Sequence, residues 1–230
     1  MERNSRIFSG KFNHKVLLLK RIMVDITRNC SCLSLKGVMS PTILKFESFS
    51  ISIFEINASD SLVRWIPPQA GWIKINSDSS LSDDRGGYGA LLRSDKANFI
   101  YAIMGRIELP SINLLELKAI EEGLWLAVRL NFPNVWIETD STTTCAWVLR
   151  KGFRPWSSIR SLRHIHQGLL LLQNWKITHI HHEGNSPADI LASSQSVRGV
   201  TTISPSQLWH ELWTALELDK VGTQYTRCRI

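Results

Sequence analysis

Four acidic residues stand at positions where their side chains could perform chemistry together. Asp78 follows an alternating segment, and Asp140 follows the short apolar segment 135–139. Glu116 falls early in an expected helix, and Asp189 falls near the start of another. In open α/β sheets the active crevice lies beyond the carboxyl ends of the strands. We therefore expect the four carboxylates to gather at one edge of a sheet.

Such a group of carboxylates indicates a site for divalent metal ions. Several negative charges held close together repel strongly in a cleft of low dielectric constant, and cations relieve that repulsion. Carboxylate oxygens suit Mg²⁺, with Mn²⁺ as an alternative, and the sequence lacks the Cys–His spacing of a zinc site. Because two such ions support in-line displacement at a phosphoryl group, the pattern predicts two Mg²⁺ ions and phosphoryl chemistry.

Each acid taken alone also fits a simpler interpretation. A single carboxylate is more often a solvated side chain or a cap than a metal ligand. Asp78, for example, fits a residue at the end of a strand that caps the following turn. The hypothesis of a metal site rests on the order and the matching contexts of all four acids.

The segment that leads to Asp78 has the period of a β-strand. Ile73 and Ile75 alternate with Lys74 and Asn76, and the alternation carries on to the acid. The pattern predicts a strand with one buried face and an acid at the end of that otherwise apolar face. Such an acid is costly to desolvate unless another group pairs with it.

Two further strands, at 88–94 and 98–107, are expected to form a hairpin. Gly86, Gly87 and Gly89 precede or enter the first of them. No helix follows these glycines directly, so a tight turn with close strand packing is a better interpretation than a loop that cradles phosphates.

The remaining segments alternate between helices and strands. The expected elements are a helix at 111–130, a strand at 135–139, helices at 141–150 and 156–172, a strand at 175–181, a helix from Pro187 and a tail helix at 206–218. This order predicts an α/β fold with a mixed sheet and helices on its faces.

The length and composition of the chain allow one domain of ordinary size with additional segments. The chain has 230 residues, of which 43% are hydrophobic, and this favours a packed core. Two prolines and a glycine within 65–72 mark a boundary. We expect a poorly structured linker at 1–64, the main domain at 65–200, and a C-terminal helix and tail at 201–230.

The charge of the chain favours a polyanionic partner, because the net charge is +7 and the isoelectric point is near 9.4. The four cysteines form no C-x-x-C pair, which indicates free thiols in a reducing compartment. The longest apolar run near the start, 16–19, is too short to span a bilayer. We expect an intracellular monomer without a membrane partner, and the sequence does not distinguish nucleus from cytoplasm.

The segment from Trp72 to Ala192 resembles a type 1 ribonuclease H domain, in the plant branch related to non-LTR retrotransposon reverse transcriptases. The blocks that carry the resemblance occur in the family's order: GWIKINSDSS, GGYGALLRS, NLLELKAIEEGL, VWIETDSTT and HIHHEGNSPADILA. The resemblance implies a ribonuclease H-like α/β fold, with a five-stranded mixed sheet (three antiparallel strands, then two parallel) and helices on both faces. Residues 2–8 resemble a linker of those reverse transcriptases, so 1–64 would be a remnant of a larger protein of that kind.

The resemblance implies a role for each of the four acids as a catalytic residue and metal ligand. Asp78 matches the first-strand aspartate that bridges both metal ions. Glu116 and Asp140 match ligands of the ion on the leaving-group side. Asp189 matches a ligand of the ion that activates the attacking water.

A histidine before the last acid would assist the reaction. His179 lies ten residues before Asp189, which is the family's spacing for a loop histidine that assists proton transfer and product release. His181 and His182 are close enough in sequence to be alternatives.

Other positions are candidates for contacts with nucleic acid. Asn113 matches a position near the start of a helix where polar side chains meet the minor groove. Ser79 stands where the family usually has glycine, and it belongs to the same candidate surface. The short linker between the middle helices lacks the basic protrusion of bacterial enzymes, and part of its role falls to Lys151, Arg154, Arg160 and Arg163. Trp156, beside Arg154 and Arg160, is the aromatic candidate for a contact with nucleic acid.

The resemblance leads to two functional hypotheses. The first is an endonuclease that hydrolyses the RNA strand of RNA–DNA hybrids with two Mg²⁺ ions, in which a wide minor groove with 2′-hydroxyls identifies the RNA strand. The alternative is a catalytically silent nucleic-acid-binding module, or a retroelement remnant, with the same fold. Metal-dependent cleavage of a hybrid separates them.

Overall fold

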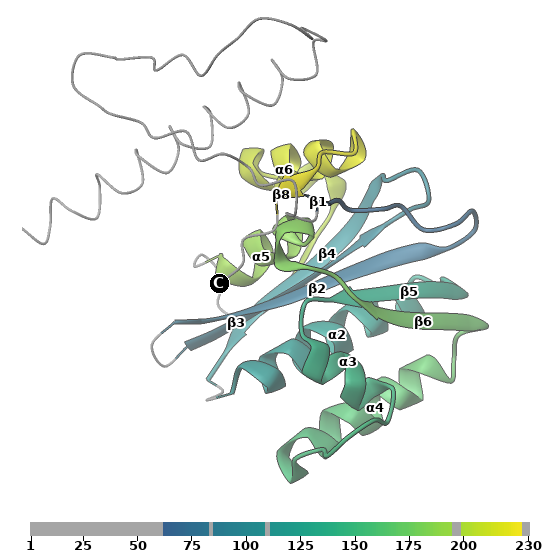
Figure 1. The fold of residues 1–230 in the computed structure, drawn as a ribbon, viewed down its shortest axis with the longest axis vertical. Coiled ribbons are helices and arrows are strands. Elements are labelled where there is room, and N and C mark those ends of the chain that lie inside the picture. The colour runs from purple at the N-terminus through teal and green to yellow at the C-terminus, as the bar shows by residue number, and fades with distance from the viewer. Residues whose placement is uncertain (1–61, 83–84, 109–110, 195–198, 227–230) are drawn as a thin grey trace, which may run out of the picture. The chain divides into compact units, whose positions relative to one another are not determined.

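The computed structural model describes residues 62–82, 85–108, 111–194 and 199–226, which build a six-stranded sheet with helices on both faces (Figure 1). All of these residues belong to the unit Ile56–Ile230. The linker predicted at 1–64 lies outside the described residues except for its last three positions. The boundaries predicted at 64 and 200 stay predictions.

The sheet contains the five predicted strands and one more. Its strands are β2 (Ile73–Ser82), β3 (Arg85–Arg93), β4 (Phe99–Ile107), β5 (Asn134–Thr139), β6 (Asn174–His179) and β7 (Val200–Ile203). Their order is β6-β5-β2-β3-β4-β7, in which β5 runs parallel to β2 and β6 runs parallel to β5. The remaining neighbours are antiparallel. The predicted mixed fold is thus confirmed, and the count of five is corrected to six because β7 pairs with the open edge of β4.

Each predicted helix is present, and its ends differ from the predicted ones by a few residues. They are α2 (Ile112–Arg129), α3 (Thr142–Val148), α4 (Ile159–Leu169), α5 (Ser186–Ser193) and α6 (His210–Lys220), with the single turns η1 (Trp156–Ser158), η2 (His182–Gly184) and η3 (Pro205–Gln207). No helix in the described ranges is both long and apolar enough to cross a membrane.

A hydrophobic cluster lies on each face of the sheet. Helices α2, α3 and α4 cover one face, where Ile75 and Leu92 pack with Leu124 and Ile165. Helices α5 and α6 cover the other face, where Leu91 lies in a second cluster that α6 also builds. Because apolar burial drives both contacts, α6 is an integral layer of the described unit.

The central strand β2 is buried on both faces, which corrects the prediction of one apolar face ending in an acid. Ile73 and Ile75 face the cluster under α2, and Lys74, Asn76 and Asp78 share the opposite face because successive side chains alternate. All five side chains are at most 5% exposed. Asp78 therefore continues a row of buried polar residues, and the strand runs past it to residue 82.

Two glycines of β3 allow α5 to approach the sheet closely. Gly87 and Gly89 lie inside the strand, rather than in the turn that was predicted. A Cβ atom at Gly87 would overlap the carbonyl oxygen of Ala192, and one at Gly89 would overlap Leu191. The absence of side chains at these positions fixes how deeply α5 lies against β3.

The strand β1 (Leu62–Val63) pairs antiparallel with β8 (Tyr225–Thr226), and together they form a separate two-stranded ribbon. Both strands lie outside the segment that resembles ribonuclease H. Among the cysteines, Cys145 on α3 is a free thiol, and the other three lie outside the described residues.

Candidate metal centre and nucleic-acid interface

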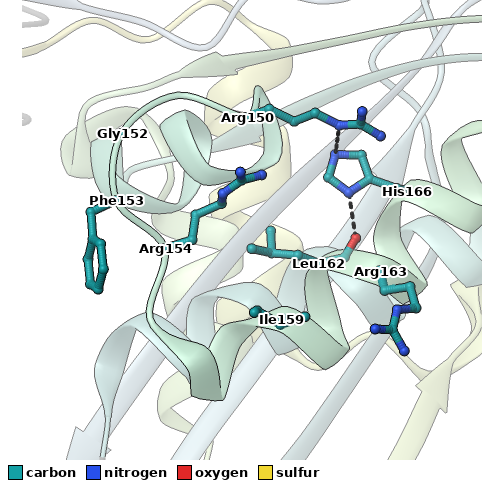
Figure 2. A pocket seen from close by; sticks show the side chains of 8 residues that line it. All are labelled: Arg150, Gly152, Phe153, Arg154, Ile159, Leu162, Arg163 and His166. Carbon is teal, nitrogen blue, oxygen red and sulfur yellow. Dashed lines mark hydrogen bonds between the residues drawn. The ribbon is translucent and has the colours of Figure 1, made fainter.

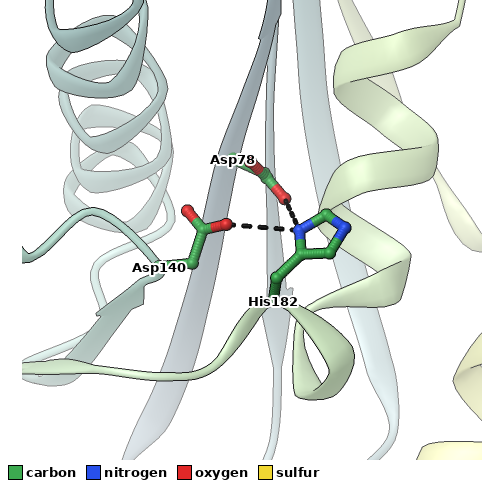
Figure 3. Close-up of side chains that lie close together, drawn as sticks. All are labelled: Asp78, Asp140 and His182. Atoms are coloured by element: carbon green, nitrogen blue, oxygen red, sulfur yellow. Dashed lines mark hydrogen bonds and ion pairs between the residues drawn. The ribbon is translucent and has the colours of Figure 1, made fainter. Parts of the chain in front are cut away.

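Two of the predicted acids, Asp78 and Asp140, come together where the parallel pairing of β2 and β5 ends. The last paired residues are Ser77 and Thr139, so Asp78 and Asp140 emerge side by side. His182 from η2 closes this group (Figure 3), with its Nδ1 at 3.3 Å from Oδ2 of Asp140 and 3.8 Å from Oδ2 of Asp78. One ligand atom from each of these three residues lies within 4.8 Å of the other two.

Glu116 reaches the same edge from the first half of α2. The Ser79 hydroxyl donates to its Oε1 at 2.6 Å, and the Thr139 hydroxyl donates to its Oε2 at 3.2 Å. Both oxygens of this buried carboxylate are therefore oriented by neighbouring strands. Ser79 thus holds a candidate metal ligand, and its hydroxyl also lies 3.5 Å from the carbonyl of Ile112.

The fourth acid, Asp189, lies in the first turn of α5. Its negative charge contributes to the raised pKa values of Asp78 and His182. The other three predicted acids thus all act electrostatically on Asp78. We refer to Asp78, Glu116, Asp140 and Asp189 as the carboxylate cluster.

The electrostatics of the carboxylate cluster show a shortage of positive charge. Burial, followed by the charges of Asp140, Glu116 and Asp189, raises the pKa of Asp78 from 3.8 to about 9. Burial also raises the pKa of Glu116 from 4.5 to about 7. Protons or bound cations would relieve this repulsion. The donor set and its crowding therefore fit a site for hard divalent cations.

The histidine in contact with the acids is His182, one of the two alternatives to His179 that the sequence left open. The hydrogen bond with Asp140 is the largest cause that raises the pKa of His182 to about 9, and the charges of Asp78 and Asp189 add to it. His179 ends β6, is exposed, and meets the ring of His181 edge-on at 5.2 Å. Only His182 among these three has a contact with the carboxylate cluster in the described part of the chain.

Asn113 lies one helical turn before Glu116 on α2 and is half-buried. Residues three apart on a helix share a face, so Asn113 lies on the same face of α2 as Glu116. This position suits a contact with a substrate whose reacting group lies over the acids.

A basic surface cavity of about 590 Å³ lies between the end of α3 and α4 (Figure 2). It is lined by Arg150, Gly152, Phe153, Arg154, Ile159, Leu162, Arg163 and His166. Arg154 is the predicted contact that lines it. Lys151 belongs to the same loop and is exposed, and Trp156 follows on η1 with 87% of its surface exposed. Cationic and aromatic side chains thus gather here as the sequence led us to expect.

Sequence reasoning missed Asn185, which binds Asp78 directly. Its Nδ2 lies 3.3 Å from Oδ2 of Asp78 and 2.9 Å from the carbonyl oxygen of Ser77. An asparagine immediately before Ser186-Pro187 has the signature of a helix N-cap, which masks any other role. Asn185 does occupy the N-cap position of α5, but its side chain makes no capping hydrogen bond. The missed signal was thus the direction of the carboxamide, which the sequence does not contain.

Comparisons with known proteins show what the chain is similar to. The family model described as reverse transcriptase-like matches residues 76–195. A curated Arabidopsis thaliana protein that is named as a ribonuclease H protein is 25% identical over 187 residues, which make up 80% of this chain and 27% of that protein. The chain therefore spans about a quarter of the length of this relative.

Two solved structures resemble the fold. The N-terminal RNase H domain of a Mycobacterium tuberculosis protein, solved as a fusion, matches with a TM-score of 0.51 and 18% identity, covering 53% of this chain and 90% of that one. RNase H1 of the archaeon Halobacterium salinarum matches with a TM-score of 0.50 and 19% identity, covering 52% of this chain and 93% of that one. The fold is therefore ribonuclease H-like.

Proposed function

The chain belongs to the reverse transcriptase-like family, and from this premise we propose that it is an endonuclease that hydrolyses the RNA strand of RNA–DNA hybrids with two Mg²⁺ ions. The observation that carries the proposal is the gathering of Asp78, Glu116, Asp140 and Asp189 at the end of the β2–β5 pair. A cluster of mutually repelling carboxylates contributes little to folding by itself, and it suits a catalytic site. Relatives that carry the ribonuclease H name support the same activity.

The four carboxylates would hold the metal ions, and Mg²⁺ fits because the donors are hard oxygen atoms. When bound, such ions stabilise the attacking and leaving oxygens of an in-line phosphoryl displacement. The protein prepares the ligands beforehand, since Ser79 and Thr139 orient Glu116 and the backbone N–H of Ser79 donates to Asp78 at 2.7 Å.

His182 is the residue that we assign to proton transfer. Its side chain is 62% exposed to solvent, and its Nδ1 faces Asp140 and Asp78. An exposed imidazole that contacts the site can carry a proton between the reacting oxygens and the solvent. His182 thus takes the role that was predicted for His179.

The substrate class follows from the surface around the cluster. A hybrid would present its minor groove, with 2′-hydroxyl groups, to polar residues such as Asn113 beside Glu116. The cavity with Arg150, Arg154 and Arg163 would take backbone phosphates, and Trp156 would supply an exposed ring for stacking. We further propose that the protein works as an intracellular monomer.

The experiment that tests this function is cleavage of a labelled RNA–DNA hybrid by the full chain, with Mg²⁺ and with chelator. We expect cleavage of the RNA strand in Mg²⁺, none in chelator, and none by Asp78→Asn. His182→Ala should slow cleavage more than His179→Ala. Equal background activity in wild type and Asp78→Asn would overturn the proposal, and salt-sensitive binding of the hybrid without cleavage would then identify a silent binding module.

A further inference from the structure

A connected set of buried polar side chains runs beneath the carboxylate cluster on the same face of β2 as Asp78. We name it the buried network, and its members are Trp65, Lys74, Asn76, Arg93, Glu138, Asn185 and Asp219. Every member is at most 6% exposed. Buried polar groups require partners, and these residues are partners of one another.

Asn76 occupies the centre of the buried network with a defined amide orientation. Its Oδ1 accepts hydrogen bonds from Nε1 of Trp65 at 2.9 Å and from Nη2 of Arg93 at 2.8 Å. Both groups are obligatory donors, so the carboxamide oxygen must face them. Its Nδ2 therefore points the other way, to Oε2 of Glu138 at 3.2 Å and Oδ1 of Asn185 at 3.3 Å.

The orientation of Asn76 determines the orientation of Asn185. Because Nδ2 of Asn76 is a donor, the oxygen of Asn185 must face it, and the Nδ2 of Asn185 turns to Asp78 and the Ser77 carbonyl. A flipped Asn185 would set its oxygen against the Asp78 carboxylate and its NH₂ group against the donors of Asn76. The direction of the donor and acceptor groups of Asn76 thus fixes the direction of those of Asn185.

Two residues that hold one end of this chain of hydrogen bonds, Asp219 and Trp65, lie outside the segment that matches the family, 76–195. Arg93 is held by Asp219 of α6, with 2.6 Å between Nη1 and Oδ2, and its guanidinium lies 3.7 Å above the Trp65 ring. A buried ion pair is a weak source of stability but can specify one geometry. Asp219 and Trp65 together fix where Arg93 presents its second nitrogen.

We propose that Asp219 and Trp65 are positioning residues for the metal centre, which act on Asp78 through Arg93, Asn76 and Asn185. The proposal rests on the proposed function, because it assigns these residues to the same metal-binding carboxylate. α6 and the segment before β2 are then parts of the active site's support. A loss of Asp219 removes the partner that holds Arg93 against Asn76, and this weakens the constraint on the two amides and on the donor to Asp78.

The experiment compares Asp219→Asn with Leu212→Ala in the full chain. Leu212 lies on the same helix, is fully buried, and packs in the cluster under α6, away from the hydrogen bonds of the network. Both variants should melt below wild type. Only Asp219→Asn should bind Mg²⁺ about 10-fold more weakly by calorimetric titration, measured well below each melting temperature, since loss of outer partners typically weakens metal binding by about 10- to 100-fold.

A second measurement reads the amides without metal or activity. The side-chain NH₂ resonances of Asn185 should shift in Asp219→Asn and stay in place in Leu212→Ala. Trp65→Phe keeps a ring over Arg93 and removes the N–H donor to Asn76, so it should shift the same resonances and serves if Asp219→Asn does not fold. Unchanged resonances, or equal Mg²⁺ affinity in the variants and wild type, would overturn the inference. Absence of cleavage by wild type with these shifts present would overturn the proposed function alone.

Discussion

The buried network and the carboxylate cluster lie along the same face of β2, and they differ in how their charged side chains are paired. In the buried network, cations meet anions: Nζ of Lys74 lies 2.7 Å from Oε1 of Glu138, and Arg93 binds Asp219. In the carboxylate cluster, acids meet acids, with His182 as the nearby base. The network pairs its cations with its anions, whereas the cluster leaves negative charge that a ligand from outside can compensate.

The difference indicates which region serves folding and which serves chemistry. A buried charge with a partner keeps the fold in one arrangement, and a buried charge next to like charges destabilises the metal-free protein. Four such acids in one place therefore suit the binding of cations that we propose above. The two regions meet at Asn185, which bonds to Asn76 on one side and to Asp78 on the other.

The largest expected effect is the loss of a charge partner in the buried network. Glu138→Ala removes the partner of Lys74 and one acceptor for Asn76, and it should lower the free energy of unfolding by about 3–5 kcal/mol. Glu217→Ala, which breaks the exposed pair with Lys220, should cost less than about 1 kcal/mol. Urea denaturation at neutral pH measures both, and equal losses would contradict the assignment.

The second effect concerns activity in place of stability. Asp189→Asn should reduce hybrid cleavage by roughly 100-fold or more, because even outer partners of metal ligands are worth about 10- to 100-fold. In chelator the variant should melt at the same temperature as wild type or slightly above it, since one repelling charge is gone. Mg²⁺ should stabilise wild type more than the variant. A variant that melts well below wild type in chelator would show Asp189 to be a structural cap.

Asp78 and Glu116 of the cluster and Lys74 of the buried network should also respond to pH with opposite signs. Asp78 and Glu116 have pKa values of about 9 and 7 in the folded protein, above 3.8 and 4.5, so the folded state holds more protons and stability falls as pH rises from about 4 to 9. Lys74 has a pKa lowered from 10.5 to about 8, mainly by burial. The unfolded state then holds more protons, and this part of the stability rises between pH 8 and 10.5.

Each proton of difference changes stability by about 1.4 kcal/mol per pH unit. Unfolding experiments at stepped pH, with chelator and with Mg²⁺, separate the two contributions. Mg²⁺ should flatten the falling part, because bound carboxylates no longer need protons, and leave the rising part in place. A falling part that Mg²⁺ does not alter would argue against metal binding by the carboxylate cluster.

The smallest effect is expected at the basic cavity. Arg154→Ala should weaken hybrid binding a few-fold and reduce the slope of log affinity against log salt by about one, because one phosphate contact is lost. Lys220→Ala on α6 removes an equal charge and should leave the slope unchanged. Binding measured at several salt concentrations with Asp189→Asn as the background avoids cleavage. Equal slopes for the two variants would place the nucleic acid elsewhere.

Much of the fold followed from local sequence patterns. The apolar period of 112–129 predicted α2, and alternation predicted β2 and the hairpin of β3 and β4. The four acids could be found because their order and surroundings matched a known arrangement. Strand β7 was missed because a four-residue strand has too short a pattern, and its partner edge on β4 lies far away in the sequence.

The faces of β2 and the buried network could not be read from the sequence. Lys74 and Asn76 appear solvent-facing by composition, and their burial depends on contacts with residues such as Trp65 that no local pattern predicts. Arg93 and Asp219 are 126 residues apart, so no local pattern links them. The choice of His182 over His179 depends on η2, a single turn that brings the ring back over the acids.

The ribbon of β1 and β8 places the two ends of residues 62–226 next to each other. Leu62 pairs with Thr226, and Val63 pairs with Tyr225. A unit whose two ends meet can be spliced into a surface loop of a host protein without stretching either partner. For protein engineering, residues 62–226 are therefore a candidate for insertion into another protein. Insertion into a surface loop of a fluorescent protein would test whether the β1–β8 ribbon alone connects the two without unfolding the host.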